Sequence, residues 1–165
     1  MPKLIMKNVT YRYRSGTMPV VNQVSCSFER GKLYAIVGPS GSGKSTLLSM
    51  LAGLDLPTEG EVCLGESNLE KLDLDRYRRE NVSMIFQAFQ LCPLLTVTEN
   101  VLYPMELNGI QLKDAIQKAE QLLLSVGITH ELMKRFPSNL SGGEQQRVAI
   151  ARSLASGSKI LLADE

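Results

Sequence analysis

A glycine-rich loop with one lysine and one serine at fixed spacing is the first stretch of this chain whose residue types could do chemistry. Gly38, Gly43, Lys44 and Ser45 fit the pattern Gly-x-x-x-x-Gly-Lys-Ser, directly after an apolar run at residues 33–37. Glycines allow backbone conformations in which successive N–H groups point at one anion. Lysine adds a full positive charge, and a serine hydroxyl can ligate Mg²⁺. The loop therefore predicts a site for nucleotide phosphates.

A helix is predicted to begin at the end of this loop, and its first unpaired amides and dipole favour an anion there. The alternative is an ordinary Gly/Ser turn, which does not require the lysine and serine at these positions. The residues predicted to bind the nucleotide phosphates are Gly38, Pro39, Ser40, Gly41, Ser42, Gly43, Lys44, Ser45 and Thr46.

A second candidate anion site lies at residues 140–147, Leu-Ser-Gly-Gly-Glu-Gln-Gln-Arg. Ser141 can cap a helix that starts at Gly142. A simple capped helix start needs one serine but has no use for two glycines in its first turn, because glycine weakens a helix. Gly142 and Gly143 therefore indicate a backbone that a phosphate can approach closely.

An apolar strand predicted at residues 159–165 ends in two carboxylates, Asp164 and Glu165. Alone, such an ending is a weak signal, because many strands finish in acidic turns. Beside a phosphate loop, Asp164 is predicted to hold Mg²⁺ opposite Ser45. Glu165 is predicted to act on the water that attacks the terminal phosphate.

The bulk properties are those of one folded domain. The chain has 165 residues, 44% of them apolar and 21% charged, with a formal net charge of +1. This balance argues against a broad nucleic-acid-binding face. The three cysteines are far apart and suit a reducing compartment. No signal peptide or membrane-length apolar run is recognised, so a membrane role is expected to need a partner.

Hydrophobic periodicity and turn residues predict an α/β chain. Prolines at positions 93, 104 and 137 are expected to divide residues 88–139 into separate short helices. Strands are predicted at residues 3–13, 20–28, 33–37, 61–65, 81–87 and 159–165, and helices at residues 45–51, 69–79, 113–126 and 142–155.

These motifs together resemble the ATP-binding cassette (ABC) family, over all 165 residues. The resemblance rests on residues 38–45 as the Walker A loop, 140–145 as the signature motif and 160–164 as Walker B, with Gln87 as the Q-loop glutamine. It implies a P-loop core with a parallel sheet. The implied parts are an antiparallel β-subdomain at 1–32, the core at 33–87, a helical subdomain at 88–140, and the signature helix with the Walker B strand at 141–165.

The family resemblance also implies roles for single residues. Tyr13 falls where the family stacks an aromatic ring on adenine, and Tyr11 competes for that role. Gln87 is expected to contact Mg²⁺ and the attacking water, and to link to a transmembrane permease. Signature residues of one cassette would contact the ATP held by a second, identical cassette; in this chain they are Ser141, Gly142, Gly143 and Glu144.

The expected protein is therefore an ATPase of a transporter, with ATP and Mg²⁺ as cofactors, peripheral at the cytoplasmic face of a membrane. Residues 86–91, 94–101 and 141–152 are similar to the branch that serves lipoprotein release, macrolide efflux and antimicrobial-peptide export. Alternatives are a non-transport ABC protein of DNA repair or translation, a nucleotide-binding regulatory module, and a small P-loop kinase, for which residues 141–144 have no purpose.

The family pattern continues past Walker B into a D-loop, further core strands and a switch histidine. None of these follows Glu165, and the only histidine, His130, precedes the signature motif. The chain is therefore expected to be the N-terminal part of a longer cassette, with an exposed sheet edge beside Walker B. Because a chain end positions a base poorly, we expect these 165 residues to hydrolyse little ATP on their own.

Overall fold

The computed structural model describes residues 3–14 and 16–164. They form two compact units, Met1–Arg78 and Arg79–Glu165, each described here by itself. No helix in the described part of the chain combines the length and apolar character needed to cross a membrane.

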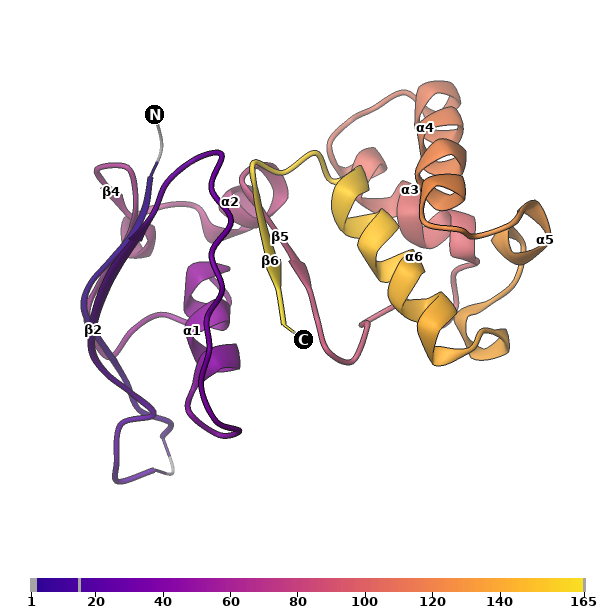
Figure 1. The fold of residues 1–165 in the computed structure, drawn as a ribbon. Helices are drawn as coiled ribbons and strands as arrows, with labels where there is room; N and C mark the ends of the chain where they lie inside the picture. The colour runs from indigo at the N-terminus through magenta and orange to yellow at the C-terminus, as the bar shows by residue number, and fades with distance from the viewer. Residues whose placement is uncertain (1–2, 15, 165) are drawn as a thin grey trace. The chain divides into compact units, whose positions relative to one another are not determined.

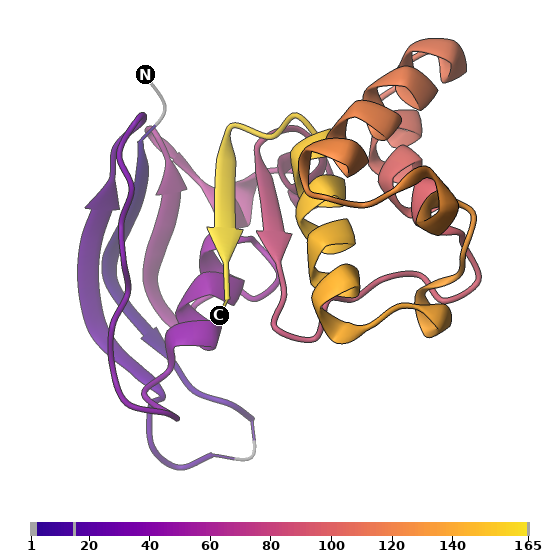
Figure 2. The same ribbon diagram turned by 45° about the vertical axis from the view of Figure 1, so that its right-hand side comes forward.

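The first unit is built on an antiparallel sheet (Figures 1 and 2). Its strands lie in the order β2-β1-β3-β4. Alternate residues of the central strand, such as Leu4 and Met6, are buried, as a half-buried strand requires. The strands are β1 (Leu4–Tyr11), β2 (Val21–Phe28), β3 (Glu59–Leu64) and β4 (Ser67–Asn68).

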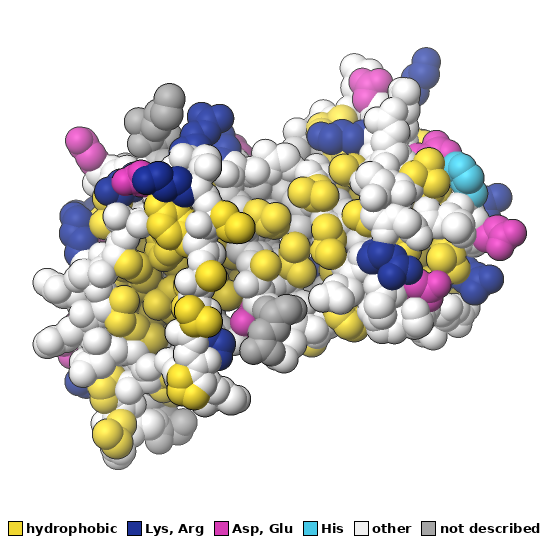
Figure 3. Space-filling view, viewed as in Figure 1, with side chains coloured by type: hydrophobic (Ala, Val, Ile, Leu, Met, Phe, Trp, Pro, Cys, Tyr) yellow, Lys and Arg dark blue, Asp and Glu magenta, His cyan; other side chains and the backbone are white. Residues whose placement is uncertain are grey.

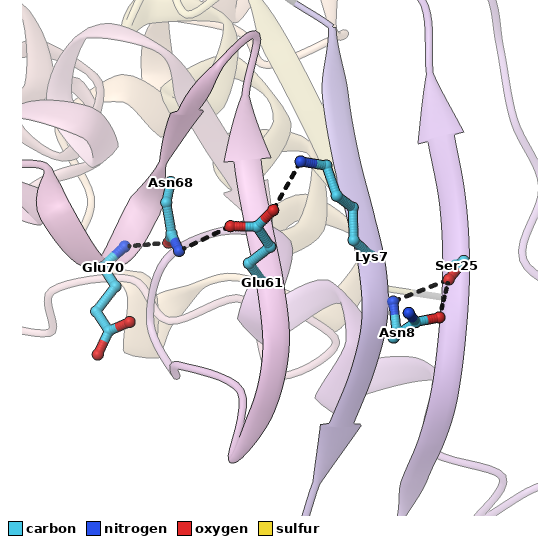
Figure 4. Close-up of polar contacts among 6 residues, drawn as sticks. All are labelled: Lys7, Asn8, Ser25, Glu61, Asn68 and Glu70. Atoms are coloured by element: carbon cyan, nitrogen blue, oxygen red, sulfur yellow. Dashed lines mark hydrogen bonds and ion pairs between the residues drawn. The ribbon is translucent and has the colours of Figure 1, made fainter.

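Strand β1 has an irregularity at Asn8, where φ is +49° and the pairing registers with both neighbours shift. Ser25 secures this point: its hydroxyl accepts from the Asn8 N–H at 2.8 Å and donates to the Asn8 side chain at 3.0 Å (Figure 4). On the other side, a Cβ at Gly60 would stand 2.3 Å from the Asn8 carbonyl oxygen, so this approach requires glycine. The bulge sets the course of β1 toward Tyr11.

Polar side chains join the strands of this sheet in Figure 4. Lys7 and Glu61 form an ion pair at 2.6 Å, and Asn68 donates to the same carboxylate at 3.2 Å. Asn68 also accepts from the Glu70 N–H at 2.9 Å, which caps the short helix η1 (Leu69–Lys71).

Helix α1 (Lys44–Leu51) lies beside the sheet within the first unit (Figures 1 and 2). Its residues Leu48, Met50 and Leu51 are buried. Helix α2 (Leu74–Glu80) follows, and the hydroxyl of its buried Tyr77 donates to the Leu51 carbonyl at 2.8 Å. This contact attaches α2 to the end of α1.

The second unit contains a parallel strand pair and a group of helices. Strand β5 (Val82–Ile85) pairs with β6 (Ile160–Ala163), and α6 packs on β5, where the Ser153 hydroxyl donates to the Met84 carbonyl at 3.4 Å. The helical core includes Val101, Leu123 and Val148, all fully buried. The helices are α3 (Val97–Leu107), α4 (Leu112–Ser125), α5 (His130–Met133), η2 (Pro137–Asn139) and α6 (Gly142–Ala155).

The predicted α/β class, with an antiparallel sheet, parallel strands and a helical segment before the last strand, is confirmed. The antiparallel sheet draws on more of the chain than residues 1–32, because β3 and β4 follow α1 in sequence. β3 pairs with β1 and thereby returns the chain, after the phosphate loop and α1, to the first strand.

The prediction of a strand at residues 33–37 is wrong. This segment precedes the glycine-rich loop and pairs with no described strand. Leu33 is 100% and Val37 is 91% exposed. Figure 3 shows hydrophobic side chains gathered on the face of the first unit that is turned toward the viewer. An apolar run indicates that a segment is suited to burial, but a strand needs hydrogen bonds to a second strand, and no local pattern supplies that partner.

The helix boundary predicted at Pro104 is also wrong, because Pro104 lies inside α3. Proline lacks the N–H that would bond the carbonyl four residues back. The residues around it, Val101 and Met105, are 0% exposed. Burial of this helix face outweighs the missing hydrogen bond, and the helix continues through it.

Candidate functional site

The glycine-rich loop joins residues 33–37 to α1 within the first unit. Gly41 and Gly43 have φ of +78° and +88°, which glycine adopts without strain. A Cβ at Gly43 would also lie 2.8 Å from the Val20 carbonyl oxygen, and one at Gly38 would lie 2.7 Å from the Ser42 hydroxyl. Gly41 and Gly43 are therefore required by their backbone conformation, and Gly43 also by its contact with the Val20 backbone, whereas the atom closest to Gly38 is a side-chain hydroxyl that is free to rotate.

Lys44 folds back over this loop. Its ammonium group donates to the carbonyl oxygens of Gly38 and Pro39, at 3.1 Å each. Helix α1 has no acidic residue in its first turn and no side-chain cap at Gly43. The helix N-terminus and the lysine charge thus remain available for an anion.

Tyr13 contacts the same helix. Its hydroxyl lies 3.0 Å from the Thr46 hydroxyl, and its ring meets the Tyr11 ring edge-on, with centroids 5.1 Å apart and an angle of 89°. Tyr13 is 48% exposed, whereas Tyr11 is half-buried and bonded to Asp55. Of the two tyrosines left open by the sequence, Tyr13 is the one with an exposed ring beside the loop helix.

The signature segment begins α6 with a reciprocal cap. The Ser141 backbone and hydroxyl both donate to the Glu144 carboxylate at 2.7 Å, and the Ser141 oxygen accepts from the Glu144 N–H at 3.4 Å. The Ser141 hydroxyl and backbone hold the pKa of Glu144 below its ordinary value.

The two glycines of this helix start are not required by the fold of the unit itself. A Cβ at Gly142 would meet nothing within 4 Å, and one at Gly143 would meet only Arg147, at 3.7 Å. Neither glycine has a positive φ. Gly142 and Gly143 are exposed at the start of α6, so a ligand from outside this unit can approach their backbone closely.

Gln87 and Asp164 follow the carboxyl ends of the two parallel strands. Ile85 pairs with Ala163, and the Asp164 N–H donates to the Ile85 carbonyl at 3.0 Å. The parallel register therefore brings these two predicted ligands to one edge of the strand pair. Ser45 belongs to the first unit, and Glu165 lies outside the described residues.

Sequence reasoning missed the residue that holds the segment after Gln87. The Arg152 guanidinium, on α6, donates to the Gln90 carbonyl at 2.6 Å and to the Phe89 carbonyl at 2.9 Å. Both of those residues have positive φ, +52° and +58°, which is costly for residues other than glycine. Arg152 thus ties the signature helix to the Q-loop segment, and no local pattern around it signals this contact.

Sequence reasoning also missed Asn100, whose side-chain amide is fully buried. Asn100 donates to the carbonyls of Cys92, Leu95 and Thr96 and accepts from the Cys92 N–H at 2.8 Å. It closes the loop between the Q-loop segment and α3. The only sequence signal was a polar residue within an apolar helical stretch.

Comparisons with known proteins agree with this geometry. The family profile described as "ABC transporter" matches residues 21–165. The chain is 41% identical to the ABC transporter ATP-binding protein Rv0986 of Mycobacterium tuberculosis H37Rv, over 99% of this chain and 68% of that protein. It is 38% identical to the ABC transporter ATP-binding protein YclH of Bacillus subtilis, over 100% of this chain and 73% of that protein.

A methionine import ATP-binding protein, MetN 2 of Lactiplantibacillus plantarum, is 44% identical over 94% of this chain and 46% of its own length. Among solved structures, the ATP-binding cassette MJ0796 superimposes with a TM-score of 0.92 at 38% identity, over 98% of this chain and 73% of that one. That structure is a dimer in a post-hydrolysis state, bound to ADP and phosphate. This chain belongs to the ABC transporter family and is an ATP-binding cassette of its ATPases.

Proposed function

We propose that this cassette is the ATP-hydrolysing subunit of an exporter, in which ATP pairs two copies head to tail and the pairing drives a membrane permease. The observation that carries the proposal is a pair of helix N-termini, α1 at Gly43 and α6 at Ser141, each with glycines before or in its first turn. Both N-termini carry the positive end of a helix dipole, which favours an anion; at α6 the Glu144 carboxylate already accepts from the Ser141 backbone and hydroxyl. One triphosphate needs one such loop to bind, so the second is available to a nucleotide held by another copy.

Within one copy, the Walker A residues would hold the triphosphate. Backbone amides of residues 38–46 would surround the phosphates, and Lys44 would leave its carbonyl partners to neutralise the terminal ones. Tyr13 would stack on the base. Ser141, Gly142 and Gly143 would close over the γ-phosphate of the partner copy.

The oxygen donors of Ser45, Gln87 and Asp164 suit Mg²⁺, which prefers hard oxygen ligands. A magnesium ion bound by them would neutralise charge on the phosphates. Glu165 would orient the attacking water and accept its proton, while Gln87 would sense the nucleotide and transmit its state to the permease. The cassette would act at the cytoplasmic face of the membrane through that permease.

The pairing is tested with a Glu165→Gln protein, which should bind MgATP without hydrolysing it. Analytical ultracentrifugation with saturating MgATP is expected to find dimers, and the Lys44→Ala protein is expected to stay monomeric. A Glu165→Gln protein that stays monomeric under the same conditions would contradict the proposal.

The transport role is tested by purifying the endogenous protein with its partners and placing the complex in vesicles. We expect a permease to co-purify and substrate to move in the export direction. Import, which the name of the MetN relative describes for that protein, would contradict the exporter assignment only. Co-purification of DNA-repair or ribosomal proteins in place of a permease would contradict transport itself.

A further inference from the structure

A polar bridge joins the end of β1 to the middle of α1. The Tyr11 hydroxyl, on β1, donates to one oxygen of the Asp55 carboxylate at 3.3 Å. The Ser49 hydroxyl, on α1, donates to the other oxygen at 2.5 Å. Asp55 itself lies in neither element, in the segment that follows the helix.

The bridge is built into the fold of this unit. Burial and then the neighbouring Asp55 charge raise the pKa of the Tyr11 phenol, so the hydroxyl stays protonated and keeps donating at neutral pH. Farther along the segment, Thr58 donates to the Thr10 carbonyl through its backbone at 2.9 Å and its hydroxyl at 2.8 Å. The segment is thus attached to β1 on both sides of residue 57.

Tyr11 in turn contacts Tyr13, the residue proposed to stack on the nucleotide base. The perpendicular contact between the two rings, at 5.1 Å, restricts the plane in which the Tyr13 ring can lie. The Tyr13 hydroxyl reaches Thr46, in the first turn of α1, one turn before Ser49. The half-exposed Tyr13 side chain is therefore held to α1 in two ways. Its hydroxyl contacts Thr46 directly, and its ring contacts Tyr11, which is linked to Ser49 through Asp55.

We infer that Asp55 and Tyr11 are positioning residues for the base site: the bridge from Ser49 through Asp55 to Tyr11 sets the Tyr13 ring at a defined distance from the phosphate loop. The inference rests on the proposed base-stacking role of Tyr13. Neither Tyr11 nor Asp55 needs to touch the nucleotide. The bridge pre-arranges the ring, so that binding ATP does not have to order it.

The test separates the base from the phosphates by comparing two ligands in titration calorimetry, ATP and inorganic tripolyphosphate. Tyr11→Phe removes the hydrogen bond but keeps the ring, and Asp55→Ala removes the acceptor. Each is expected to weaken ATP binding about two- to tenfold, as for the loss of one hydrogen bond, and to leave tripolyphosphate binding unchanged. The double variant is expected to be no weaker than the worse single variant, because both changes break the same bridge.

Tyr13→Ala and Tyr103→Phe complete the set. Tyr103 is 53% exposed on α3, in the second unit. Removing its hydroxyl is expected to change the affinity for neither ATP nor tripolyphosphate. If Tyr13→Ala leaves ATP affinity unchanged, the proposed base site is wrong. If Tyr13→Ala weakens ATP binding but Tyr11→Phe and Asp55→Ala do not, only the positioning inference is wrong. Equal weakening of ATP and tripolyphosphate by Tyr11→Phe would also contradict it, because the bridge would then support α1 as a whole.

Discussion

Asn100 shows how much one buried amide can organise. It is 1% exposed, and its side chain uses its oxygen and its nitrogen to satisfy four backbone groups of the loop at 92–96. Removing the side chain would take this partner from the Cys92 N–H and the Leu95 carbonyl, whereas the carbonyls of Cys92 and Thr96 would each keep a backbone N–H.

We therefore expect Asn100→Ala to lower the free energy of unfolding by about 1–3 kcal/mol. Asn108→Ala is the matched control, because Asn108 is exposed and donates to a single carbonyl, that of Ser156, at 3.1 Å. That change is expected to cost less than about 1 kcal/mol. Urea unfolding measures both, and equal losses would show that the loop does not depend on Asn100.

Two helices of the second unit begin with the same reciprocal cap. In α3 the Thr96 backbone and hydroxyl donate to the Glu99 carboxylate at 2.7 Å, as Ser141 does to Glu144 in α6. The Thr96 hydroxyl and backbone hold the pKa of Glu99 below its ordinary value. The pattern Ser/Thr-x-x-Glu is local, which is why the helix start at Gly142 was predictable from sequence.

This cap predicts a pH dependence of stability. Because the pKa of Glu99 is lowered on folding, its contribution is complete above the unfolded value near 4.5 and is lost as the pH falls through the lower folded value. We expect the Glu99→Gln protein to be less stable than the wild type at pH 7, and the difference to shrink by pH 3. Urea midpoints at both pH values measure it.

An equal difference at pH 7 and pH 3 would mean that the carboxylate charge has no part in the cap. Lys7→Gln and Lys32→Gln do not test a lysine titration between pH 7 and pH 3, because the ordinary pKa of both lysines is 10.5 and both stay charged over that range. Their partner-raised pKa values concern stability at alkaline pH instead.

The whole cassette is expected to work as a pair, and complementation between two inactive variants tests the head-to-tail arrangement. Lys44→Ala disables one Walker A loop, and Ser141→Arg blocks one signature segment. In a mixed head-to-tail pair, both defects fall in the same composite site, and the other site keeps an intact Lys44 and an intact Ser141.

We therefore expect each variant alone to hydrolyse no ATP above background and the mixture to regain activity. A phosphate-release assay over a range of mixing ratios measures this, with the maximum expected near equal amounts. A mixture as inactive as its components would contradict composite sites, although each chain could still bind ATP.

The sequence by itself determined the features that depend on a few neighbouring residues. Glycine spacing predicted the phosphate loop, where φ of +78° and +88° at Gly41 and Gly43 demands glycine. The Ser141 cap and the apolar stripe of α4 were equally local, because capping and helical periodicity act within one or two turns.

Only the tertiary structure decided which distant segments meet. Tyr11 reaches Asp55 across 44 positions, and Arg152 reaches the Gln90 carbonyl across 62. Likewise, β3 pairs with β1, whereas residues 33–37 pair with no described strand. Such contacts depend on the path of the intervening chain and on the burial of many side chains at once, and no short stretch of sequence encodes either.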